Sequence, residues 1–246
     1  MRSRFVMTVV GGLVGLLTLS GCSDISAQLS GEQVTDPELS EKLVSPLLET
    51  VSWGEVDGML SVVVRNPGER TLRHATAEFV ARDADGATVG SSTSSEKKGT
   101  CCTVYDLQPD QEYGFYFDVG VDAGQVAEVD VAYRDVAWRT GQTAPVPAMR
   151  GAPVTMTSNT LGAVVVADVT SPASPVGQAV VQAFLDGPDG DFIAVVSGRW
   201  TCFAAGTPRR IQMQLYHPLP AGTTVESMVA YPVGEDAEHP APDCAA

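Results

Sequence analysis

The sequence predicts an all-β protein with two tandem immunoglobulin-like antiparallel β-sandwiches, which follow a signal peptide and a flexible tether. Three observations support this prediction. Apolar and polar residues alternate through most of the chain after residue 48, with the period of two that is typical of half-buried strands. Glycine and proline are frequent, with 24 and 16 residues, and they separate the alternating runs. Two blocks of the chain also resemble each other.

The first 21 residues have the three parts of an export signal. Arg2 and Arg4 supply positive charge, and residues 5–19 are uncharged and mostly apolar, but too few for a membrane span of about 20 residues. Residues 19–22 read Leu-Ser-Gly-Cys, which resembles the lipobox of bacterial lipoproteins. The resemblance implies a diacylglyceryl anchor on Cys22 and a place at the cell membrane, on its extracytoplasmic face.

The remaining chain divides into a tether, two sandwiches, a linker and a tail. The polar tether is expected at 22–47, with a short helix at 37–44. The expected ranges of the other parts are 48–136 for the first sandwich, 137–153 for the linker, 154–233 for the second sandwich and 234–246 for the Pro-rich C-terminal tail.

Turn signals define the strands expected in the first sandwich. A strand at Glu49–Val56 leads through the hairpin turn Asp57-Gly58 into a strand at Met59–Asn66. Further strands are expected at 75–82, 100–107, 113–119 and 126–134. In the last of these, the alternation places Ala127, Val129, Val131 and Tyr133 toward the core.

The sequence pattern of the first sandwich recurs in the second. Residues 123–133 align without gaps on 221–231, with six of eleven positions identical. Residues 79–86 align on 183–190, and Tyr113, Phe115 and Phe117 correspond to Ile211, Met213 and Leu215. The difference between the two offsets falls in a loop, where deletions are tolerated. We therefore expect two copies of one β-domain.

Two segments of the first copy carry a family resemblance. Residues 77–86 end a strand with Asp-Ala-Asp-Gly, and residues 107–117 join Leu-Gln-Pro-Asp to an aromatic strand. This pattern resembles the FxLYD-type domains of bacterial envelope proteins, over about 60–133 and more weakly over 164–231. Asp110 stands where that pattern prefers glycine, and the tyrosine of the naming motif is absent. The resemblance implies an extracytoplasmic immunoglobulin-like fold and transfers no active site.

Four cysteines other than Cys22 form an even set, which favours two disulfides in an oxidising compartment. They are Cys101, Cys102, Cys202 and Cys244. Self-contained domains would pair Cys202 with Cys244 and leave a vicinal Cys101–Cys102 bond, which could be a redox switch, a binding loop or a structural kink. The alternative links the two domains. Adjacent strand residues point to opposite faces, which favours the self-contained pairing. Residues 100–102 align with 201–203, so Cys202 is expected to correspond to Cys101 or Cys102.

No catalytic or metal-binding constellation is expected. Ser94 and Lys97 have the Ser-x-x-Lys spacing without its companion motifs, and the acidic runs at 83–86 and 186–190 suit turns better than calcium loops. The histidines, His74, His217 and His239, lack metal-ligand spacing. Trp53, Trp138 and Trp200 are candidates for a recognition surface, although packing is expected for at least two of them.

The formal net charge of −15 argues against a nucleic-acid partner, which would select a basic surface. We therefore expect a non-enzymatic envelope lipoprotein without a cofactor, which binds or scaffolds an envelope protein or a cell-wall component. The alternatives are an accessory subunit of a transport or cell-wall system and, in another class, a hydrolase with an unrecognised site.

Overall fold

The computed structural model describes residues 47–92, 102–120, 123–139, 149–233 and 244. The predicted all-β fold is confirmed, because strands dominate these residues and every pair of neighbouring strands is antiparallel. The elements are β1 (Glu49–Val56), β2 (Met59–Arg65), β3 (Leu72–Arg82), β4 (Thr88–Ser91), β5 (Thr103–Leu107), β6 (Glu112–Asp118), the 3-10 turn η3 (Ala123–Gln125), β7 (Glu128–Trp138), β8 (Arg150–Asn159), β9 (Gly162–Thr170), β10 (Val176–Asp186), β11 (Phe192–Phe203), β12 (Arg209–Leu215) and β13 (Thr224–Pro232).

The first sandwich stacks two sheets. One has the order β1-β2-β6, and in the other β3 pairs with β7 on one side and with both β4 and β5 on the other. Side chains that alternate along the strands meet between the sheets, as the period of two predicts. These buried residues include Leu60, Val62, Val64, Ala75, Ala77, Phe79, Ala81, Val104, Tyr113, Phe115, Phe117 and Tyr133.

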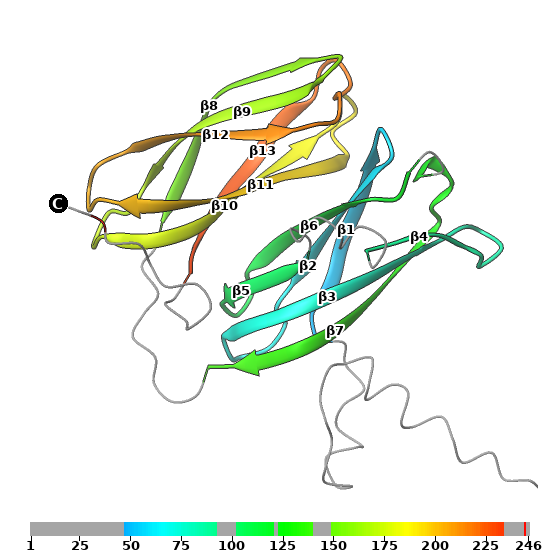
Figure 1. Ribbon diagram of the computed structural model, residues 1–246, viewed down its shortest axis with the longest axis horizontal. Helices are drawn as coiled ribbons and strands as arrows, with labels where there is room; N and C mark the ends of the chain where they lie inside the picture. The colour runs from blue at the N-terminus through cyan, green and yellow to red at the C-terminus, as the bar shows by residue number, and fades with distance from the viewer. Residues whose placement is uncertain (1–46, 93–101, 121–122, 140–148, 234–243, 245–246) are drawn as a thin grey trace, which may run out of the picture.

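The second sandwich repeats this strand order. Its sheets are β8-β9-β12 and β13-β10-β11, so the continuous strand β11 takes the place of β4 and β5 together. Its buried residues include Ala163, Val165, Ala167, Val169, Val181, Ala183, Leu185, Ala194, Val196, Ile211, Met213 and Leu215. Figure 1 shows the two groups of strands side by side, with β10 and β11 next to the sheet of β1, β2 and β6.

Small irregularities repeat as well. The register of β1 shifts at Val51, and the register of β8 shifts at Val154, the equivalent position one repeat later. Such one-residue bulges bend an edge strand and disturb its outer ladder. Both valines are largely exposed, at 46% and 43%. Together with the common strand order, the matched bulges support two copies of one domain.

The alignment of the two last strands needs a correction. Ala77 pairs with Tyr133, whereas its equivalent Val181 pairs with Ala230, so Tyr133 corresponds to Ala230 and not to Tyr231. A one-residue register shift opposite Phe184 accompanies the displacement. Because neighbouring strand residues point to opposite faces, the two aligned tyrosines face in different directions. Ala127 was also predicted to be inward, but it is exposed and precedes β7.

The expected equivalence of the cysteines is wrong for a related reason. Ala75 pairs with Val104 and its equivalent Ala179 pairs with Trp200, so Cys202 corresponds to Asp106. Cys202 and Asp106 also both have a positive φ, 62° and 49°, which is independent evidence that the two positions correspond. The sequence alignment misplaced this strand because it crosses a loop whose length differs between the two copies.

The predicted turn between β1 and β2 agrees with the structure, whereas the predicted linker does not. Asp57 and Gly58 form the predicted turn with positive φ at both positions, 49° and 80°. The predicted linker 137–153 is too long, because β7 continues to Trp138 and β8 begins at Arg150. The signal peptide and the helix predicted at 37–44 lie outside the described residues. No helix among the described residues is long and apolar enough to cross a membrane.

Candidate functional site at the junction of the two sandwiches

The two sandwiches meet through the outer faces of the sheets β1-β2-β6 and β11-β10-β13. Every residue of Met59–Val64 in β2 and of Ala179–Leu185 in β10 is buried. One face of each strand lies in its own core, so the other face is covered by the other sandwich. We call this contact region the junction; its apolar centre contains Val63, Phe184 and Val195.

Gln182 is the principal polar residue of the junction and is 1% exposed. Its Oε1 accepts a hydrogen bond from the backbone N of Gly114 at 2.7 Å, and its Nε2 donates to the carbonyl of Gly114 at 2.6 Å. The side-chain amide thus pairs with β6 as another strand would. A side chain at Gly114 is excluded, because its Cβ would lie 2.6 Å from Cγ2 of Val195.

Two further hydrogen bonds cross the junction. The hydroxyl of Tyr231 donates to the carbonyl of Glu112, two residues before Gly114 on the same edge of β6. The backbone N of Val195 donates to Oγ of Ser61 at 3.1 Å. Side chains of the second sandwich therefore satisfy the free edge of β6, and buried polar groups of both sandwiches find partners.

Burial also affects the phenols near the junction. Desolvation raises the pKa of Tyr231 and the pKa of Tyr113, whose rings are 5.1 Å apart. Both side chains consequently stay neutral further into the alkaline range than an exposed tyrosine, and the Tyr231 hydroxyl remains a hydrogen-bond donor to Glu112.

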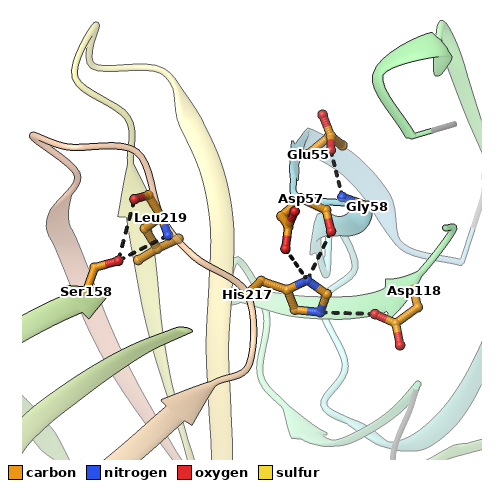
Figure 2. Close-up of polar contacts among 7 residues, drawn as sticks. All are labelled: Glu55, Asp57, Gly58, Asp118, Ser158, His217 and Leu219. Atoms are coloured by element: carbon orange, nitrogen blue, oxygen red, sulfur yellow. Dashed lines mark hydrogen bonds and ion pairs between the residues drawn. The ribbon is translucent and has the colours of Figure 1, made fainter. Parts of the chain in front are cut away.

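One end of the junction is charged (Figure 2). His217 follows β12 and lies between the β1–β2 turn and the end of β6. Its Nδ1 is 3.1 Å from the carbonyl oxygen of Asp57 and 3.6 Å from Oδ2 of the same residue. Its Nε2 is 3.1 Å from Oδ1 of Asp118. The imidazole, which is 22% exposed, thus joins two elements of the first sandwich to the second.

Both sides of this charged end are held by local hydrogen bonds (Figure 2). Oε1 of Glu55 accepts from the backbone N of Gly58 at 3.0 Å and fixes the β1–β2 turn. Oγ of Ser158 accepts from the backbone N of Leu219 at 3.1 Å and holds the segment that carries His217. The histidine and its acceptors therefore sit on two locally restrained segments.

The chemistry available at His217 is limited. Its polar contacts in the described structure are two aspartates, neither of which is a nucleophile oriented for acyl transfer. Among the described residues, no group of three His, Cys, Asp or Glu side chains could hold a metal ion. The geometry of this end supports an interdomain contact.

The cysteines predicted to form disulfides are partly described. Cys202 pairs with Cys244, with 5.2 Å between the Cα atoms, as expected for self-contained domains. Cys102 is disulfide-bonded and buried, with φ of 92°, while Cys101 lies outside the described residues. Cys22 also lies outside them, and its lipidation stays a prediction.

Other predicted candidates are dispersed. The carboxylate of Asp83 accepts hydrogen bonds from the backbone N of Asp85 and of Ala87, which is the geometry of a turn. Ser94, Lys97 and His239 lie outside the described residues. Trp138 and Trp200 pack against the first and second cores, whereas Trp53 on the edge strand β1 is 36% exposed.

Sequence reasoning missed the junction, although a signal was present. Residues 59–64 and 179–185 contain hardly any polar side chains, so both faces of each strand are apolar or small. Such continuous runs are typical of strands buried on both faces. Gln182, a long polar residue inside one of these runs, also marked the position of a buried hydrogen-bonding group.

No family model and no curated protein sequence matches this chain. Among solved structures, similarity is reported to the transglutaminase of red sea bream, with 13% identity, a TM-score of 0.20, and coverage of 81% of this chain and 33% of that one. A calcium-binding mutant of Bacteroides uniformis beta-glucuronidase 2 shows 12% identity, a TM-score of 0.20, and coverage of 78% and 27%. The chain thus spans about a third or less of those proteins, and these likenesses carry no functional argument.

Proposed function

We propose that this chain is a cell-envelope lipoprotein, anchored through a diacylated Cys22, that binds or scaffolds another envelope component without catalysing a reaction. The observation that supports this proposal is the junction between the two sandwiches. Gln182 and Tyr231 of the second sandwich complete the free edge of β6 in the first. A buried, hydrogen-bonded junction restrains the relative orientation of two domains far more than a linker alone, and a scaffold needs that restraint.

The exposed apolar side chains suggest where a partner binds. Val51 and Trp53 lie on β1, an edge strand of the first sandwich, and are 46% and 36% exposed. Tryptophan is enriched among residues that dominate binding energies. Because the bulge at Val51 disturbs the outer ladder of β1, we expect a segment of a cell-wall-associated or envelope protein to pack on these side chains and not to pair with the strand.

An accessory subunit of a transport or cell-wall system is the second candidate, and it uses the same surface. A hydrolase ranks below both, because the polar contacts of His217 within the described part of the chain are with Asp57 and Asp118.

The anchor is tested by metabolic labelling with an alkyne fatty acid. Labelled wild-type protein should contrast with unlabelled Cys22→Ser protein that fractionates away from membranes. Equal labelling of the two proteins would refute the anchor.

The binding surface is tested with a photo-crosslinking residue at position 51 in the membrane-anchored protein. Position 154 is a matched control, because Val154 occupies the equivalent bulge and is similarly exposed. We expect one defined envelope component to crosslink at position 51 and not at position 154. No adduct at position 51, or the same adducts at both positions, would contradict binding through β1.

A further inference from the structure

Both ring nitrogens of His217 face hydrogen-bond acceptors. Nδ1 faces the carbonyl oxygen of Asp57, and Nε2 faces a carboxylate oxygen of Asp118, each at 3.1 Å. A carbonyl oxygen and an ionised carboxylate only accept hydrogen bonds. A neutral imidazole has one N–H, so it can satisfy one of these contacts, whereas the imidazolium satisfies both.

We infer that His217 is a protonation-dependent latch between the two sandwiches. The protonated ring donates to Asp57 and to Asp118 and closes this end of the junction. The neutral ring gives up one of the two hydrogen bonds and the attraction to both carboxylates. Histidine changes its charge near physiological pH, so this contact responds to mild acidification or alkalinisation.

The charged groups around His217 come from the first sandwich. The β1–β2 turn contributes Asp57 and Glu55, and Glu55 is occupied by the backbone N of Gly58. The end of β6 contributes Asp118. On its own side, the flanking contact is the uncharged pair of Ser158 and Leu219. Both charged partners of the ring are therefore carboxylates, and each attracts the protonated ring more strongly than the neutral ring.

The remainder of the junction does not depend on this proton. Gln182 and Gly114 exchange two uncharged hydrogen bonds, and Ser61 accepts from the backbone of Val195. Release of the latch thus loosens one end and leaves the sandwiches joined.

The loosened end carries exposed apolar residues. Tyr216 precedes His217 and is 74% exposed, and Leu161 in the neighbouring β8–β9 hairpin is 81% exposed. The hairpin packs on the same segment, because a Cβ at Gly162 would lie 2.2 Å from the carbonyl oxygen of Leu215. The latch therefore controls how firmly the segment of Tyr216 and His217, together with the hairpin that packs on it, is held against the first sandwich.

The test combines imidazole NMR with amide hydrogen exchange on the full mature chain. The variant His74→Gln/His239→Gln leaves His217 as the one histidine. The ¹⁵N signals of the ring distinguish two protonated nitrogens from one, and they report which form of His217 is present at pH 5.5 and at pH 8. After correction for intrinsic rates, the amides of Gly58 and Leu219 should exchange about tenfold faster at pH 8, the change expected from losing one hydrogen bond.

Two controls separate the latch from general loosening. The amide of Gly114, which donates to Gln182, should show the same protection at both pH values and reports whether each variant is folded. His217→Gln should abolish the pH difference at Gly58 and Leu219 while Gly114 stays protected. An equal protection of these amides at both pH values in the parent, or a pH difference that persists in His217→Gln, would overturn the latch.

Discussion

The two sandwiches share a strand order but fill their cores with different side chains. In the first, the ring of Phe79 lies 5.2 Å from that of Phe115 and 5.3 Å from that of Phe117. In the second, the equivalent positions hold smaller aliphatic residues such as Ala183, Met213 and Leu215. Strand order and register therefore define this repeat, because the same framework packs around aromatic or aliphatic residues.

The sandwiches also secure their last strands differently. Asp106 is 5% exposed and accepts a hydrogen bond from Nε of Arg139, just after β7, at 2.7 Å. The equivalent position in the second sandwich is Cys202, which is bonded to Cys244 beyond β13. An ion pair and a covalent bond therefore fasten the chain at the same place in the two copies.

Alkaline pH should give the largest difference in stability between the two sandwiches. Burial raises the pKa of Tyr113 and of Tyr133 in the first core, whereas an unfolded tyrosine ionises near pH 10. Above about pH 10 the unfolded chain releases protons that the folded chain retains, so stability falls as pH rises. Each unit by which the folded pKa of a phenol exceeds its unfolded pKa corresponds to about 1.4 kcal/mol of stability.

The buried residues described in the second core include no tyrosine, because Tyr231 of β13, whose pKa burial also raises, packs against the first core. Hydrogen exchange between pH 9 and pH 12 should therefore show amides of β3 losing protection before those of β9. Simultaneous loss in both sandwiches, in a Tyr133→Phe variant as well as in the parent, would mean that the phenols do not determine alkaline stability.

Removal of the disulfide should destabilise the second sandwich. For a sequence separation of 42 residues, the loss of chain restraint corresponds to about 4 kcal/mol. The double variant Cys202→Ser/Cys244→Ser should lose most of this in denaturant unfolding. Substitution is preferable to a reducing agent, because Cys102 is also disulfide-bonded. A change below 1 kcal/mol would indicate that β13 is secured by packing alone.

Asp106→Asn tests the corresponding fastening in the first sandwich. The substitution removes the charged acceptor of Arg139 while keeping the shape of the side chain, and a hydrogen bond to a charged group contributes about 1.5–3 kcal/mol. The exposed pair Arg82 and Asp130 provides a control, since solvent screens it and Asp130→Asn should cost much less than Asp106→Asn. Equal losses of stability in the two variants would show that burial of Asp106 does not strengthen its interaction with Arg139.

The smallest effect separates the two tyrosines that the sequence aligns. Tyr231→Phe removes the hydrogen bond to Glu112 and should cost about 1 kcal/mol. Tyr133→Phe should be neutral or slightly stabilising, because the Tyr133 hydroxyl is buried without a hydrogen-bond partner among the described residues. Thermal unfolding of the two variants measures the difference, and equal destabilisation would contradict their assignment to different faces.

Much of the fold could be predicted because local sequence determines it. The turn at Asp57-Gly58 and the alternation of Leu60, Val62 and Val64 are short-range signals, and they located β1 and β2 closely. The register of β13 could not be predicted, because a one-residue bulge leaves no mark in an ungapped alignment. The contact of His217 with Asp57 and Asp118 joins residues separated by about a hundred positions or more, and no local pattern encodes it.

The junction also has a consequence for the order in which the chain can fold during synthesis. Val180, Tyr231 and Val233 belong to the same buried cluster as the first core, although they are made long after β7. Until the second sandwich has folded against it, the first sandwich therefore has an uncovered apolar face and an open strand edge on β6. That edge is a template for pairing with another chain until Gln182 and Tyr231 arrive. An isolated fragment ending at the linker should consequently aggregate, and chaperone binding should be concentrated in the interval before the last strand is made.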